Sequence, residues 1–271
     1  YKRQTPYFNH MKIATWNVNS IRTRQQQVIE WLKANPVDIL CLQETKVIDQ
    51  DFPRSPFVEL GYHIYVSGQK SYNGVAIFSR SPMQEVSSGF APILGVDIVG
   101  DFDIQKRLIT GIINDVRILN LYVPNGASVG SEKYDYKLDW LKLLQKYLRI
   151  ILDKSPNLCV CGDFNIVPED RDIYDPEGCK NSVGLSDAER QGLQEILKLG
   201  LVDAFRQFTR EGGHYSWWDY RAAGFERNRG WRIDHHYLSL PLSQKATSCT
   251  IDKSPRQLTK PSDHAPVIVE F

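Results

Sequence analysis

The stretch NLCVCGDFNIVP (157–168) passes from an apolar run into a pair of polar residues. A short apolar run of this kind is typical of a strand that is covered on both faces. Asp163 and Asn165 follow it, and residues two apart on one strand point to the same side of a sheet. The pair suits chemistry at a strand end, or an Asx-type turn that simply ends the strand, and this stretch alone leaves both interpretations open.

Apolar runs with turn residues between them continue in both directions along the chain. Strands are expected at 12–18, 37–44, 62–68, 74–81, 107–114, 116–124, 157–165, 232–240, 245–252 and 265–271. Helices are expected at 22–36, 131–155 and 186–205, the last with Ser186 and Glu189 as a capping box. Helices fall between groups of strands, and no low-complexity linker divides the chain. The pattern predicts an α/β fold of two packed mixed β-sheets flanked by helices, a four-layer sandwich.

The composition is that of an ordinary globular protein. The chain has 271 residues, 42% of them hydrophobic, and its formal net charge is +1, so any nucleic-acid site has to be a local patch. Residues 1–10 are polar and aperiodic, and we expect an extension without a functional role there and a single domain at 11–271. No apolar stretch approaches the length of a membrane span, and no secretory signal pattern opens the chain.

The five cysteines are an odd number and are interpreted as buried free thiols in a reducing compartment. Cys41 lies inside the apolar run VDILCLQ (37–43). Cys159 and Cys161 are two apart on one expected strand, a spacing that suits neither a disulfide between them nor a zinc knuckle.

Several expected strands end or begin in dense polar groups. These groups contain Asn17 and Asn19, Glu44, Asp163 and Asn165, Asp234 with His235 and His236, and Asp263 with His264. Carboxylate and amide oxygens bind hard divalent cations, and a protonated imidazole stabilises phosphate charge. The groups therefore predict a divalent-metal phosphodiester site, although an acid beside a strand, as in the case of Asp38, can equally be a solvated edge.

Two further segments have the character of nucleic-acid-binding surface. SWWDYRAAGFERNRGWR (216–232) contains three tryptophans, a tyrosine, a phenylalanine and four arginines, and GQKSYNG (68–74) is a loop with Lys70 and Tyr72. Aromatic rings stack on bases or fill the gap at an abasic site, and arginines neutralise phosphate. The alternative for the first segment is a tryptophan-rich corner of the core, and the interleaved Arg, Asn and Gly residues favour the binding interpretation.

The ordered set of motifs resembles the exonuclease III group of abasic-site (AP) endonucleases, within the endonuclease/exonuclease/phosphatase superfamily. The matching motifs cover 11–271 and are WNVNSIR, DILCLQETK, GYHIYVSGQKSYNGVAIFSR, NLYVPNG, GDFNIVPEDRDI, LVDAFR, YSWWDYR, NRGWRIDHHYLS and KPSDHAPV. The resemblance implies a DNA-repair endonuclease that cuts the phosphodiester 5′ to an abasic site in duplex DNA and leaves a 3′-hydroxyl. It also implies 3′-5′ exonuclease and 3′-end-cleaning activity, a Mg²⁺ or Mn²⁺ cofactor, and a monomer in the cytoplasm. Segment 174–190 varies across such relatives and is where substrate selection is expected to differ.

The resemblance also implies roles for individual residues. The expected metal residues are Glu44 as principal ligand, with Asn19 and Asp263 beside it. The expected catalytic residues are Tyr122, Asp163, Asn165, Asp234 and His264. The expected substrate-binding residues are Asn17, Arg107, Asn125, Trp217, Trp231 and Ile233, and the last three form an apolar pocket for a flipped-out abasic sugar.

In this scheme Asp163 orients or deprotonates the attacking water, and Asn165 faces the phosphate. The resemblance therefore favours the catalytic interpretation of stretch 157–168. Phe164, between the two polar residues, is expected to point into the core. Two alternatives stay open: a non-specific nuclease or phosphodiesterase of the same superfamily, and a catalytically inactive relative that binds nucleic acid as a regulator.

Overall fold

The computed structural model describes residues 10–271, so the expected extension at 1–10 lies outside the described residues except for His10. Two six-stranded sheets form the centre of this part of the chain. The first runs, in spatial order, β13 (Ser248–Ile251), β14 (Val267–Glu270), β1 (Lys12–Asn17), β2 (Ile39–Gln43), β4 (Val75–Ser79) and β3 (His63–Ser67). The second runs β5 (Gln84–Ser88), β6 (Leu108–Ile113), β7 (Val116–Tyr122), β8 (Leu158–Asp163), β12 (Asp234–Ser239) and β9 (Leu201–Asp203). Both sheets are mixed. In the first, β1 is parallel to β2 and antiparallel to β14, and in the second, β7 is parallel to β8 and antiparallel to β6.

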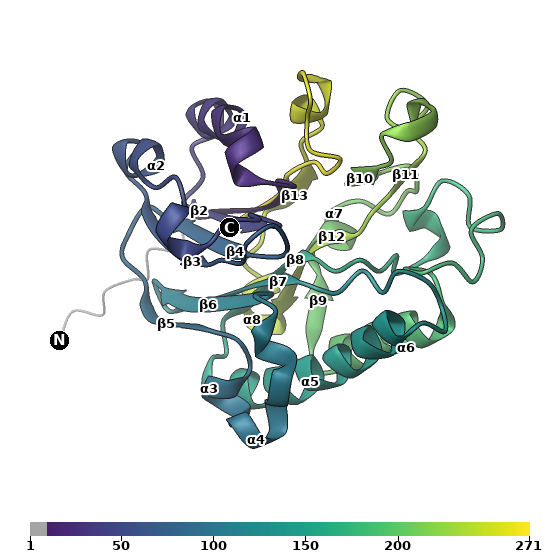
Figure 1. The fold of residues 1–271 in the computed structure, drawn as a ribbon, viewed down its shortest axis with the longest axis horizontal. Coiled ribbons are helices and arrows are strands. Elements are labelled where there is room, and N and C mark those ends of the chain that lie inside the picture. Colours follow the sequence, from purple (N-terminus) through teal and green to yellow (C-terminus); the bar gives the residue numbers. More distant parts are fainter. Residues whose placement is uncertain (1–9) are drawn as a thin grey trace.

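Helices cover the outer faces of both sheets (Figure 1). α1 (Ile21–Ala34) and α2 (Ser55–Glu59) flank the first sheet, and α5 (Glu132–Lys154) and α6 (Asp187–Leu197) flank the second. The shorter helices are α3 (Ala91–Leu94), α4 (Val96–Val99), α7 (Ala204–Phe208) and α8 (Leu240–Ser243). A small ladder of β10 (Trp217–Trp218) and β11 (Gly230–Trp231) stands apart from both sheets. This arrangement confirms the predicted four layers.

Each apolar strand contributes side chains to two hydrophobic cores, one on either face of its sheet, because successive side chains of a strand point to opposite faces. On β8, Cys159 and Cys161 belong to the core between the sheets, whereas Leu158 and Val160 pack with α5 and α6. The predicted buried thiols are confirmed for Cys41, Cys159, Cys161 and Cys249, while Cys179 is half-buried. Within residues 10–271, no helix has both the length and the apolar character that crossing a bilayer requires.

One helix is shorter than its sequence pattern predicts. The capping box of Ser186 and Glu189 is present, but α6 ends at Leu197, so the prediction of one helix over 186–205 was wrong. Gly200 has φ +99°, which ends the helix, and β9 and α7 follow. The side chain of Asp203 caps α7 by accepting hydrogen bonds from the next turn.

Asn120 of β7 ties the two sheets together beneath the site. Its amide donates to the carbonyl oxygens of Leu42 (3.0 Å) and Ala76 (2.9 Å) in the first sheet and accepts from Gln43 (2.7 Å). The side chain is fully buried, so its partners would lose their hydrogen bonds without access to water.

We therefore expect Asn120→Ala to lower the free energy of unfolding by about 2–4 kcal/mol, the range for breaking a buried hydrogen-bond network. Urea unfolding measures it. Gln26→Ala, which removes an exposed amide from α1, is the matched control and should change stability by less than about 0.5 kcal/mol. Equal effects of the two substitutions would contradict the structural role of Asn120.

Candidate active site

The strand directions bring distant polar residues to one edge of the sandwich. Asn17 is the last residue of β1, and Glu44 follows β2, its parallel neighbour. In the other sheet, Asp163 is the last residue of β8 and is paired with Asp234, the first residue of β12. His264 precedes β14 of the first sheet. Five residues that are far apart in the sequence thus meet where the two sheets open.

Three of these residues form a candidate metal-binding group. One ligand atom from each of Glu44, Asp163 and His264 lies within 4.8 Å of the others. Asn17 braces the group, since its Nδ2 donates to Glu44 Oε1 and to Asp163 Oδ2, both at 2.9 Å. The carboxylates of Glu44 and Asp163 offer hard oxygen ligands that fit a divalent cation such as Mg²⁺ or Mn²⁺, and the His264 imidazole lies beside them.

Asn19 and Asp263, also expected at the metal, lie just outside this group. Asn19 Nδ2 donates to Asp263 Oδ1 (3.1 Å), and Trp217 Nε1 donates to Asp263 Oδ2 (2.9 Å). Lys46 connects them to Glu44, because its Nζ lies 3.0 Å from Glu44 Oε2 and 2.6 Å from Asn19 Oδ1. Lys46 was not expected at the site from the sequence, although it lies in the motif DILCLQETK two residues after Glu44.

A chain of buried ionisable groups runs through the site. His264 Nδ1 lies 2.8 Å from Asp234 Oδ2, and His264 Nε2 lies 3.7 Å from Asp163 Oδ2. Burial disfavours the charged imidazole, but Asp234 and Asp163 outweigh burial and raise the pKa of His264 to about 10. Burial also raises the pKa of Asp163 to about 7. At neutral pH the site thus combines a stable imidazolium with a carboxylate that is poised to exchange a proton.

The stretch 157–168 combines the two predicted features, a polar pair at the candidate site and an Asx-type turn that ends a strand. β8 ends at Asp163, and Asn165 lies beyond it with φ +50°, so the prediction that both residues lie on one strand was wrong. The backbone N–H of Asn165 donates to Asp163 Oδ1 (2.9 Å), which is an Asx-type turn. Phe164 is fully buried, as predicted. The turn ends the strand, and it also fixes one oxygen of Asp163 while the other faces Asn17 and His264.

The model of the endonuclease/exonuclease/phosphatase family matches residues 14–264. The chain belongs to the endonuclease/exonuclease/phosphatase family.

Its similarity to individual members of the family extends over almost the whole chain. It is 34% identical to exodeoxyribonuclease III of Haemophilus influenzae, covering 96% of this chain and 100% of the relative. A 3′ phosphatase from Neisseria, solved with a product DNA hairpin, is 42% identical with a TM-score of 0.91, covering 96% of this chain and 99% of that one. An AP endonuclease from Archaeoglobus fulgidus is also 42% identical, with a TM-score of 0.90 and the same coverage.

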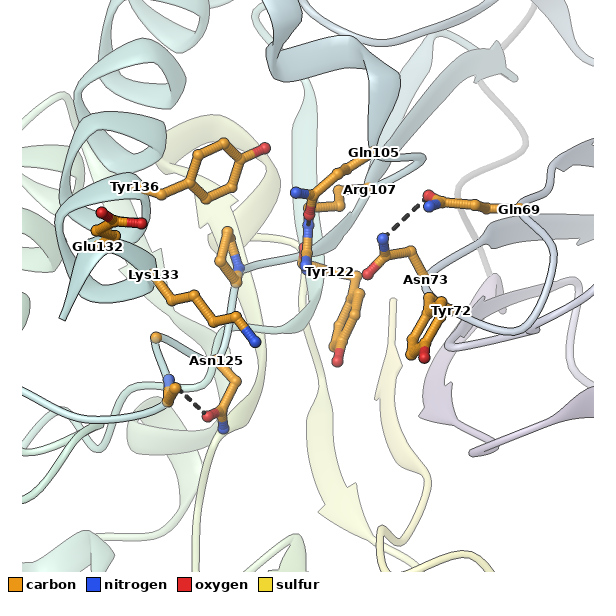
Figure 2. Close-up of a pocket in the computed structure, with 13 residues that line it drawn as sticks. Gln69, Tyr72, Asn73, Gln105, Arg107, Tyr122, Asn125, Glu132, Lys133 and Tyr136 are labelled. Carbon is orange, nitrogen blue, oxygen red and sulfur yellow. Dashed lines mark hydrogen bonds between the residues drawn. The ribbon is translucent and has the colours of Figure 1, made fainter.

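In this member of the endonuclease/exonuclease/phosphatase family, an open groove of about 600 Å³ adjoins the polar group. Tyr122, Arg107 and Asn125, all expected from the sequence, line it together with Tyr72 (Figure 2). The guanidinium of Arg107 lies 4.7 Å from the centre of the Tyr122 ring. The expected surface loop 68–74 thus reaches the groove, with Tyr72 70% exposed. Gln105, Lys133 and Tyr136 also line the groove, and they were not expected from the sequence because they lie outside the matching motifs.

The aromatic segment 216–232 forms a wall beside the polar group, where Trp217 pairs with His264 in an isolated β-bridge. The ring centres of Trp217 and Trp231 lie 5.3 Å apart in an edge-to-face contact, and both rings pack against a buried apolar cluster that contains Ile233. The binding interpretation of 216–232 was wrong for two of its residues. Trp218 is fully buried, and Arg232 is held inside by ion pairs with Asp172 (2.6 Å) and Asp203 (2.8 Å), so neither is available to DNA.

Proposed function

We propose that this protein is a divalent-metal-dependent DNA-repair nuclease that hydrolyses the phosphodiester 5′ to an abasic site in duplex DNA and leaves a 3′-hydroxyl. The proposal includes 3′-5′ exonuclease and 3′-end-cleaning activity. The observation that carries it is the convergence of Glu44, Asp163 and His264 between an open groove and an aromatic wall. The names of its relatives, an exodeoxyribonuclease III, a 3′ phosphatase and an AP endonuclease, support this substrate class.

In the proposed reaction Asp163 orients the attacking water and accepts its proton, which a pKa of about 7 makes favourable near neutral pH. The His264 imidazolium, fixed by Asp234 at 2.8 Å, stabilises negative charge on the phosphate. Burial raises the pKa of Tyr122 well above its ordinary value, so its phenol stays protonated and serves as a donor.

The other site residues complete the proposal. Asn17 and Asn165 hold and flank the reacting phosphate. Glu44, with Asp163 beside it and Asn19 and Asp263 further out, would hold Mg²⁺ or Mn²⁺, which when bound supplies positive charge next to the phosphate.

Substrate selection is assigned to the two sides of the site. Arg107 and Asn125 contact the DNA backbone from the groove. Trp217, Trp231 and Ile233 receive an abasic sugar that has rotated out of the duplex and leave no space for a base.

Trp231→Ala should reduce discrimination between abasic and intact duplex by about 10-fold, because a widened pocket admits a nucleotide, which costs roughly 1–3 kcal/mol of selectivity. Competitive cleavage of the two duplexes in one tube measures the ratio. Phe208→Ala removes a half-exposed ring outside this cluster and serves as the control. A ratio that stays at the wild-type value would contradict the pocket.

The function itself is tested with three end-labelled duplexes: one with a single tetrahydrofuran abasic analogue, one intact, and one nicked with a 3′-phosphate. We expect incision 5′ to the analogue with a 3′-hydroxyl product, abolished by EDTA and restored by Mg²⁺ or Mn²⁺. Equal cutting of the intact duplex would favour a non-specific nuclease. Binding without cleavage in the presence of metal would favour an inactive binding protein.

We also infer that the protein acts as a monomer on chromosomal DNA in the cytoplasm. A single chain supplies both the polar group and the aromatic wall, so the proposed site is complete without a second copy. Light scattering during size-exclusion chromatography tests the oligomeric state.

A further inference from the structure

A buried ion pair lies behind the candidate active site, between α5 and α6, the helices that flank the second sheet. Lys137 of α5 and Glu189 of α6 are both fully buried, and Lys137 Nζ lies 2.6 Å from Glu189 Oε1. Such a pair is not explained by stability, because two charges withdrawn from water recover little more than their desolvation cost. Neither residue was expected at the site from the sequence.

Lys137 holds two loops that line the site. A lysine ammonium has three N–H donors, and the second and third go to the backbone carbonyl oxygens of Asn165 (2.7 Å) and Asn125 (3.2 Å). Asn165 forms the turn on Asp163, and Asn125 lines the groove. All three donors are thus used, and two of them fix backbone directly beneath proposed substrate contacts.

Glu189 holds a third loop, next to the aromatic wall. Its oxygens accept from the backbone N–H of Gly184 (2.9 and 2.8 Å) and from the N–H and hydroxyl of Ser186 (3.1 and 2.6 Å). Gly184 has φ +89°, and a Cβ at this position would lie 3.1 Å from Trp231 Cζ3 and 3.3 Å from the Asn165 carbonyl oxygen. The turn therefore packs against both the wall and the Asn165 loop.

We propose that Lys137 and Glu189 are positioning residues, which act through backbone to set Asn165, Asn125 and Trp231 at the distances that the reaction needs. This inference rests on the proposed function. The pair touches no substrate itself but positions Asn125, a proposed DNA contact, so its loss should lower kcat more than it raises KM for duplex DNA. A charged pair suits this role because charge-assisted hydrogen bonds hold several carbonyl and N–H groups at once, which an apolar pair of equal volume cannot do.

The test compares the double variant Lys137→Met/Glu189→Gln with the wild-type protein, since the double variant leaves no unpaired buried charge. We expect it to fold, with kcat on abasic duplex at least 10-fold lower, KM within about 3-fold, and reduced preference for abasic over intact duplex. Glu189→Gln alone keeps an acceptor for Gly184 and Ser186 and should lower kcat by a smaller factor, so it tests the role even if the double variant does not fold.

Arg117→Met is the matched control. Arg117 is a buried cation at the other end of β7, where it hydrogen-bonds Ser155 (2.9 Å) and pairs with Glu85. The Arg117→Met variant should lose about as much thermal stability as the double variant and keep the wild-type kcat. A double variant that behaves like Arg117→Met, less stable but equally fast, would overturn the positioning role.

The crystal structure of the double variant separates this inference from the proposed function. Displacement of the backbone at Asn165 and Gly184 is expected, and unshifted loops would overturn the inference. If the wild-type protein does not cut abasic duplex, the proposed function fails, and the loop positions in the variant still decide whether the pair sets them.

Discussion

Asp163→Asn is expected to lower kcat for cleavage of abasic duplex by about 10³-fold, within the range for loss of a general base. The amide cannot accept a proton from water at any working pH, whereas the Asp163 carboxylate has a pKa raised by burial to about 7. The size and shape of the side chain are unchanged, so binding of the duplex should stay within a few-fold of wild type. Single-turnover cleavage with excess enzyme measures the chemical step directly.

The control for this prediction is Asp170→Asn. Asp170 is an exposed acid seven residues further along the chain that pairs with Arg190 at 2.8 Å. This variant should cleave within about 2-fold of wild type, because exposed ion pairs contribute little. An Asp163→Asn protein that nicks abasic duplex at nearly the wild-type rate would refute the assignment of Asp163.

His264→Gln is expected to cost about 10²–10³ in kcat, because it removes a buried positive charge beside the phosphate. The exposed His63 of β3 provides the control, and His63→Gln should leave the rate unchanged. An equal effect of the two substitutions would mean that the His264 charge takes no part in the reaction.

The pH profile of kcat/KM is a second test of the roles of Asp163 as base and His264 as cation. The rate should rise as the pH passes about 7, where Asp163 loses its proton, and fall near pH 10, where His264 loses its proton. Asp234 raises the pKa of His264, so Asp234→Asn should move the alkaline limb of the profile to lower pH. An alkaline limb that does not move in this variant would contradict the Asp234–His264 pair.

Much of the fold could be predicted from the sequence because its signals are local. The unbroken apolar runs of β2 and β8 predict strands that are buried on both faces, and both strands are fully buried. Ser186 and Glu189 predict the start of α6 because the two residues form a capping box at its N-terminus. β5 escaped prediction because its side chains are mostly exposed and show no apolar pattern. The end of α6 depends on Gly200 and on pairing of β9 with β12, which a helical spacing of apolar residues does not reveal.

The candidate site was predictable residue by residue only where polar groups interrupt apolar strands. Glu44, Asp163 and His264 stand out in this way, and the structure brings them together. Arg232 and Trp218 look like DNA-binding residues in the sequence, but their environment is set by Asp172, Asp203 and other distant partners. The reverse applies to Lys137 and Lys46. Each has the sequence context of a surface lysine, but in the folded protein Lys137 pairs with Glu189 and Lys46 pairs with Glu44.

The central claim is that Glu44 holds one divalent cation beside Asp163 and the His264 imidazolium, and anomalous diffraction from a crystal soaked in Mn²⁺ tests it most directly. We predict a single strong peak within about 2.5 Å of a Glu44 carboxylate oxygen, in a protein that Mn²⁺ also activates for cleavage of abasic duplex. A peak bound elsewhere, or metal-activated cleavage that survives Glu44→Ala, would contradict the account.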